Sequence, residues 1–134
     1  MVQNPLLQAL RRGFDAYPAI QVAYLYGSVA RGDSGPTSDV DVALLADQPI
    51  DLMVLAALGG QLEAMVHRLV DVVDLRLAPP LLCRQVVAEG KPLIARDLQL
   101  KFEFEQAAVR YCEDTRPLRT QQQLLLRERV AHGG

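Results

Sequence analysis

The segment YGSVARGDSGPTSDVDVALL, residues 26–45, limits what this chain can fold into more than any other stretch. It places two aspartates, Asp39 and Asp41, two positions apart in a run of β-branched and apolar residues. A carboxylate that leaves water for an apolar setting is costly unless a partner compensates its charge. The pair therefore lies either at a solvent-exposed edge or beside a cation.

Strand-like runs alternate along the chain with segments of helical periodicity. The predicted strands are IQVAYLY at 20–26, SDVDVALLA at 38–46, VDVVDLRLA at 70–78 and KPLIA at 91–95. The predicted helices begin behind Asn4-Pro5, at Asp51, at Pro79-Pro80, at Asp97 and beyond Pro117. The second helix contains Gly59-Gly60, which either kinks it or joins two shorter helices. Residues 98–105 alternate like a strand, but their helical spacing farther along favours a helix.

This alternation predicts an α/β (α+β) fold, with a small mixed β-sheet flanked by helices. A chain of 134 residues is long enough to bury a core and corresponds to one domain. We expect the core of that domain at about residues 20–95 and C-terminal helices at about 97–131.

Composition excludes several function classes. The formal net charge of −2 argues against polymeric DNA or RNA as the main ligand. No secretory signal and no apolar run of ~20 residues is found, so we expect a cytoplasmic protein without a membrane span. Cys83 and Cys112 form no CxxC pair, which fits a reducing compartment. With only His67 and His132 as histidines, any catalysis is expected to rest on carboxylates.

In a strand, alternate side chains point to the same face, so Asp39 and Asp41 are expected to lie on one side of the sheet. Two like charges ~4 Å apart repel by roughly 4 kcal/mol at an effective dielectric of 20. Mg²⁺ removes this repulsion and prefers a few carboxylates together with phosphate oxygens and water. The pair therefore indicates a site for a metal-bound nucleotide.

Gly27-Ser28 directly follows the first predicted strand and precedes a probable helical turn. Glycine lets the backbone approach a phosphate closely, and the turn amides and the serine hydroxyl are hydrogen-bond donors. Gly27 and Ser28 are therefore candidate nucleotide-binding residues. Arg31 is a third candidate; its alternative role is an ion pair with a nearby acid such as Asp33.

Gly27-Ser28, ten intervening residues and Asp39-Val40-Asp41 resemble the GSx10DxD signature of the DNA polymerase β-like nucleotidyltransferase superfamily. The segment, and the length of the chain, are most similar to the minimal nucleotidyltransferase (MNT) proteins. The resemblance covers residues 20–95 closely and the C-terminal helices loosely. It implies the polymerase β-like nucleotidyltransferase core, and a third acid on a neighbouring strand.

The predicted strand at 70–78 offers Asp71 and Asp74 for this third acid. They are an odd number of residues apart, so on a regular strand they face opposite sides and only one joins the pair. The family pattern favours Asp71, because the acid there follows a hydrophobic residue at the start of the strand. Asp74 is the alternative.

The resemblance also implies an activity. In this superfamily the three acids, here Asp39, Asp41 and Asp71, bind two Mg²⁺ ions while a hydroxyl attacks the α-phosphate of a nucleoside triphosphate. MNT proteins resemble the MntA-type antitoxins of HEPN/MNT toxin–antitoxin pairs, which transfer AMP from ATP to a tyrosine of a HEPN ribonuclease. The expected partner is thus a HEPN toxin, docked on a helix at 121–130. Two alternatives stay open: an antitoxin that neutralises by binding alone, and an enzyme that modifies a small molecule such as an aminoglycoside.

Overall fold

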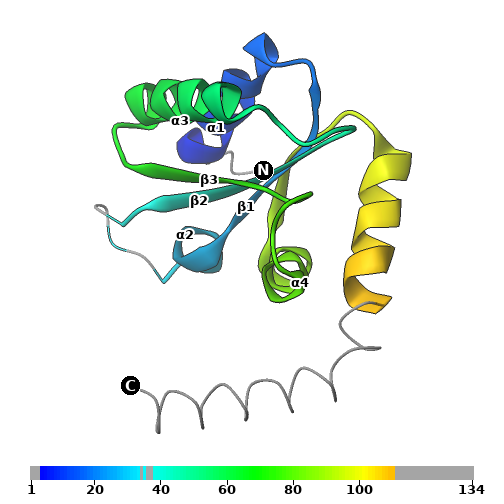
Figure 1. The fold of residues 1–134 in the computed structure, drawn as a ribbon. Helices are drawn as coiled ribbons and strands as arrows, with labels where there is room; N and C mark the ends of the chain where they lie inside the picture. Colours follow the sequence, from blue (N-terminus) through cyan, green and yellow to red (C-terminus); the bar gives the residue numbers. More distant parts are fainter. Residues whose placement is uncertain (1–3, 34, 36–37, 111–134) are drawn as a thin grey trace, which may run out of the picture.

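A computed structural model describes residues 4–33, 35 and 38–110 of the chain. Four strands form one sheet in the spatial order β3-β2-β1-β4. They are β1 (Ile20–Tyr26), β2 (Val40–Ala46), β3 (Val70–Asp74) and β4 (Lys91–Ala95). β1 runs antiparallel to β2 and β4, whereas β2 and β3 are parallel. The sheet is thus mixed, and helices lie on both of its faces (Figure 1).

The two central strands are nearly continuous apolar runs, because helices cover both faces of the sheet. Every residue of β1 is buried except Gln21, and every residue of β2 is buried except Asp41. Asp41 is thus the one acidic residue in an otherwise apolar central strand. Its position sets it apart as a candidate for chemistry.

Two helices, α1 (Pro5–Gly13) and α3 (Leu52–Val66), pack together on one face of the sheet (Figure 1). Each begins at a side-chain cap: Asn4 and Asp51 each accept a hydrogen bond from the amide two residues later. The cap at Asn4 and the start of a helix at Asp51 agree with the sequence. The fully buried large side chains of this layer include Leu10, Phe14, Leu44, Leu58 and Leu62.

The other face is covered by α4 (Pro80–Glu89) and by a helix over residues 98–110, with the short α2 (Gly27–Arg31) beside them (Figure 1). The rings of Tyr24 and Phe104 lie 6.3 Å apart between their centroids, which ties the last described helix to β1. Because α2 follows β1 without a break, the sheet itself fixes where α2 begins.

The expected fold class is confirmed: a small mixed sheet is flanked by helices. The strands predicted at 20–26 and 91–95 have the predicted bounds. The choice of a helix over the ambiguous stretch after 97 is also confirmed, and Asp97 Oδ1 accepts a hydrogen bond from Leu100 N at 3.0 Å as its cap. The last predicted helix, including the expected docking helix at 121–130, lies outside the described residues.

Three element boundaries differ from expectation. β2 begins at Val40, so Asp39 lies just before the strand and not inside it. β3 ends at Asp74, where a turn follows, closed by a hydrogen bond from Leu77 N to Asp74 O at 3.1 Å. α3 runs unbroken through Gly59-Gly60, because packing of its other residues on the sheet outweighs the low helix propensity of two glycines. No helix among the described residues is long and apolar enough to span a membrane.

Candidate active site

Three side chains on adjacent strands form a row across the sheet. The strand register places Tyr26 of β1 opposite Asp41 of β2, and Asp41 opposite Asp71 of β3. Neighbouring strands are about 4.8 Å apart, and residues in register point to the same face. Tyr26 is buried, Asp41 is partly buried and Asp71 is exposed, so the row runs from the core of the sheet to solvent at its edge.

The charges in this row affect one another. The pKa of Asp41 is raised, first by burial and then by the negative charges of Asp71 and Asp39, while Arg31 opposes the shift. Burial raises the pKa of Tyr26 to about 12, and Asp41 and Asp71 add to the rise. The negative charges of the neighbouring acids thus make Asp41 and Tyr26 harder to ionise, as is common where a protein gathers carboxylates at a functional site.

Gly27 packs directly against Asp41. A Cβ atom added at Gly27 would overlap Asp41 Oδ2, and the Gly27 φ angle of +77° lies in the left-handed region. Both facts require glycine at this position. The backbone at the start of α2, followed at once by the partly exposed Ser28, is therefore held beside the central carboxylate of the row.

Asp39 is brought to the same region from just outside β2. The residue is exposed, and its charge contributes to the raised pKa of Asp41. The expectation that both acids lie within the strand is wrong for Asp39, which precedes the first residue of β2. Their interaction through space is nevertheless present, because the chain enters β2 at Val40 with Asp39 adjacent to the site.

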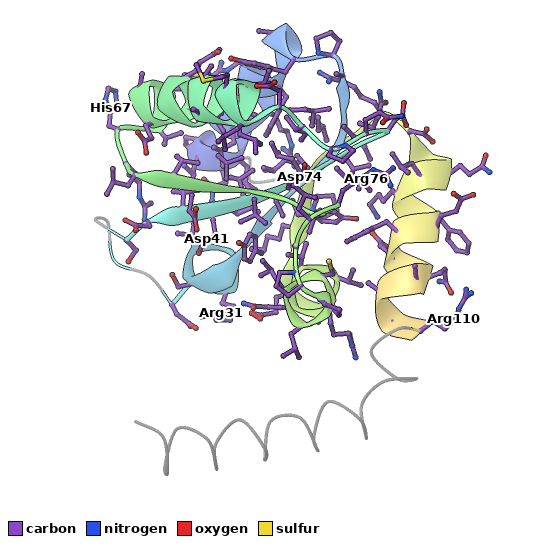
Figure 2. All side chains as sticks on the ribbon, in the orientation of Figure 1. Arg31, Asp41, His67, Asp74, Arg76 and Arg110 are labelled. Atoms are coloured by element: carbon purple, nitrogen blue, oxygen red, sulfur yellow. The ribbon has the colours of Figure 1, made fainter. Side chains whose placement is uncertain are left out.

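Asp74 has a different environment from Asp71. It is 5% exposed and accepts hydrogen bonds from Ile50 N at 2.8 Å and Arg76 N at 3.0 Å. Figure 2 shows Asp74 and Arg76 together at the end of β3, away from Asp41. Asp74 thus stabilises the chain after β2 and the turn after β3 through backbone amides.

Arg31 pairs with acids, as its alternative interpretation suggested. Its Nε lies 3.0 Å from Asp33 Oδ2, and its Nη1 lies 2.8 Å from Glu89 Oε2 on α4. These ion pairs join α2 to α4 near Asp41 (Figure 2). Glu89 gave no signal in the sequence, because the contact joins residues that are distant along the chain.

The donor set fits Mg²⁺ in its chemistry. Asp39, Asp41 and Asp71 offer hard carboxylate oxygens, which Mg²⁺ prefers, and Gly27 lets the backbone lie directly against Asp41. Across residues 4–33, 35 and 38–110, no three His, Cys, Asp or Glu side chains are already close enough together to hold a metal ion. The charges of Asp71 and Asp39 act on Asp41, and a cation bound among the three carboxylates would offset their repulsion.

A cavity of about 520 Å³ lies at the other end of β1 and β2 from Asp41. Its lining is mainly apolar and includes Tyr17, Ile20, Ile50 and Val54. We assign the chemistry to the acidic row and not to this cavity, because the raised pKa values of Asp41 and Tyr26 and the glycine turn are found at the row.

Comparison with known proteins agrees with this assignment. In sequence, the chain is 38% identical over 91 residues to the protein adenylyltransferase MntA of Shewanella oneidensis. The alignment covers 68% of this chain and 63% of that relative, so the chain matches a little under two thirds of its length.

Two solved structures are similar over nearly the whole chain. One is a toxin–antitoxin complex with AMP-PNP, with a TM-score of 0.75, 30% identity and coverage of 92% of this chain and 98% of that one. The other is the tri-AMPylated Shewanella oneidensis HEPN toxin in complex with its MNT antitoxin, with a TM-score of 0.68, 27% identity and the same coverage. The family described as polymerase beta nucleotidyltransferase matches residues 8–99, and the chain therefore belongs to that family.

Proposed function

We propose that this protein is a Mg²⁺-dependent adenylyltransferase that moves AMP from ATP to a tyrosine hydroxyl of a HEPN toxin. The observation that carries the proposal is the register of Asp41 with Asp71, beside a glycine turn against which Asp41 packs. The relatives supply the substrate class: one is an adenylyltransferase, and another is complexed with an AMPylated toxin.

In this proposal the three acids have separate roles. Asp39 and Asp41 hold Mg²⁺ on the triphosphate, and Asp71 completes a second metal position. When bound, the metal neutralises phosphate charge. Asp71, at the exposed end of the row, accepts the proton of the tyrosine hydroxyl. The hydroxyl oxygen bonds to the α-phosphorus, the bond to the β-phosphate oxygen breaks, and pyrophosphate leaves.

Gly27 and Ser28 bind the nucleotide. The turn at Gly27 keeps the backbone free of side-chain atoms next to Asp41, and Ser28 adds a hydroxyl donor. Arg31 is proposed to contact phosphate after releasing Asp33 or Glu89, which are its partners without nucleotide. We further propose that one domain spans the chain and that the reaction takes place in the cytoplasm, where ATP and Mg²⁺ are available.

The test combines the protein with labelled ATP, Mg²⁺ and its toxin partner, followed by mass spectrometry of the toxin. We expect a tyrosine of the toxin to gain one AMP residue, and expect none with Asp41→Asn or with EDTA. If the toxin is neutralised without gaining label, and the Asp41→Asn variant neutralises it equally well, the protein is an antitoxin that acts by binding alone. Label on an aminoglycoside and none on the toxin would indicate a small-molecule enzyme.

A further inference from the structure

Arg68 lies in the connection between α3 and β3 and holds the loop that leads into β2. Its Nε and Nη2 both donate to Ser38 O, at 3.0 and 2.7 Å. Nη2 also donates to Gly35 O at 3.1 Å. A planar guanidinium makes such a set of bonds at fixed angles, which the ammonium of lysine does not reproduce. Within the described residues Arg68 has no ion pair, so its hydrogen bonding is directed at this loop.

The residue after Arg68 holds the other side of Asp39. Leu69 O accepts a hydrogen bond from Val40 N at 2.8 Å. Arg68 thus binds the carbonyl of Ser38, just before Asp39, and the next residue, Leu69, binds the amide of Val40, just after it. No hydrogen bond or ion pair in the described part of the chain holds the Asp39 carboxylate itself, so the contacts that place this residue are the two backbone anchors on either side of it.

The same connection leads to the third acid. Two residues after Leu69, β3 carries Asp71 opposite Asp41. The segment 68–71 therefore anchors the backbone on both sides of Asp39 and also carries Asp71. It thereby links the position of Asp39 to that of the Asp41–Asp71 pair.

The turn that presents Arg68 is conformationally unusual. His67, labelled in Figure 2 at the end of α3, has φ 57° and ψ 37° in the left-handed region. It is the single non-glycine residue with positive φ in the described parts of the chain. A left-handed residue commonly ends a helix, and here His67 N donates to Glu63 O at 2.8 Å, so the end of α3 turns the chain toward Arg68 and Leu69.

We propose that Arg68 is a positioning residue of the metal–nucleotide site, acting through Asp39. By holding Ser38 O it keeps the backbone of Asp39 in a position from which the carboxylate can bind a metal together with Asp41 and Asp71. This inference rests on the proposed function, because it needs a metal-bound nucleotide at the three acids. It adds a residue that no motif in the sequence indicated.

The test measures binding of Mg²⁺–AMP-PNP by isothermal titration calorimetry, without toxin, to the full chain and its variants. We expect Arg68→Ala to weaken binding by about tenfold or more, the usual loss when a group that orients a metal ligand is removed. Arg68→Lys, which keeps the charge but not the planar fork, is expected to lose nearly as much. The control is Arg12→Ala, an exposed arginine of α1, which should bind like the wild type.

A double-mutant cycle separates positioning from a general structural role. If Arg68 acts through Asp39, Arg68→Ala adds little to the loss already caused by Asp39→Asn. Fully additive losses would overturn the proposal, as would wild-type binding by Arg68→Ala. Should Asp39→Asn bind too weakly to titrate, the comparison of Arg68→Ala and Arg68→Lys with Arg12→Ala decides.

Thermal midpoints complete the design. A lower midpoint for the Arg68 variants with unchanged Mg²⁺–AMP-PNP affinity would show a merely structural role and would also overturn the proposal. The proposed function fails separately, if the wild-type protein binds Mg²⁺–AMP-PNP but transfers no AMP to the toxin. The two failures are therefore distinguishable.

Discussion

Asp41 and Asp71 face each other across the parallel strands β2 and β3, at one register position. Asp74, three residues farther along β3, pairs in register with Leu44 and is buried. The two candidates for the third acid therefore differ in surroundings: one stands next to the central carboxylate, and the other is bound to backbone amides. We therefore expect the substitution of asparagine for aspartate to affect catalysis at position 71 and stability at position 74.

We predict that Asp71→Asn lowers kcat for AMP transfer by at least ~100-fold, the usual effect of losing a general base, and leaves the thermal midpoint nearly unchanged. Asp74→Asn should do the reverse. It keeps kcat but loses about 1–3 kcal/mol of stability, because an amide cannot accept both backbone bonds as well as a carboxylate does. Kinetics and thermal unfolding of both variants check this, and loss of turnover with Asp74→Asn alone would reassign the third acid.

Gly27→Ala and Gly32→Ala form a matched pair. Both glycines have positive φ, +77° and +80°, so each alanine costs about 1–2 kcal/mol of backbone strain. Only at Gly27 does the new methyl overlap Asp41; at Gly32 no atom lies within 4 Å. We predict a lower thermal midpoint for both, with the larger drop for Gly27→Ala because of the added overlap with Asp41, and at least tenfold weaker Mg²⁺–AMP-PNP binding for Gly27→Ala alone, measured by calorimetry. Equal binding by both variants would contradict the placement of the nucleotide beside Gly27.

The raised pKa of Asp41 predicts that Asp41→Asn stabilises the metal-free protein, by an amount that depends on pH. An acid whose pKa is higher in the folded state destabilises the fold when ionised, and the penalty is complete above that folded pKa. This penalty disappears below the pKa of an aspartate in the unfolded chain, which is about 3.9. We therefore expect Asp41→Asn to raise the thermal midpoint in EDTA at pH 8, and to give no gain near pH 3.5.

Two controls accompany the pH series. Asp15→Asn, at an exposed acid outside the site, should not show the same pattern. Adding Mg²⁺ should stabilise the wild type more than Asp41→Asn, because binding to the folded state alone raises its stability. If neither the midpoint in EDTA nor the gain with Mg²⁺ changes, the acids do not act as one cluster.

Arg31→Ala tests whether this arginine contacts phosphate. Its partners Asp33 and Glu89 are surface acids, and surface ion pairs contribute little to stability, so the thermal midpoint should change little. We predict that KM for ATP rises by at least ~5-fold, because an arginine–phosphate bond is charge-assisted. Glu89→Gln, which frees one side of Arg31, should leave KM unchanged or lower it. An unchanged KM for Arg31→Ala would restrict Arg31 to its ion pairs.

The sequence alone determined the elements and the motif. Local signals are complete within a few residues: Asn4, Asp51 and Asp97 cap helices, and apolar runs define β1 and β4. The spacing of Gly27-Ser28 to Asp39 and Asp41 likewise identified the family, because the motif is contiguous in the chain.

The tertiary structure decided which residues meet. The register of β2 with β3 brings Asp41 beside Asp71 and buries Asp74, and the start of β2 at Val40 leaves Asp39 to be held from outside the strand. Arg68 reaches a loop 30 residues away in sequence, which no local pattern encodes. Strand register and such long-range bonds depend on how the whole core packs, and the physical chemistry of a short segment does not contain that information.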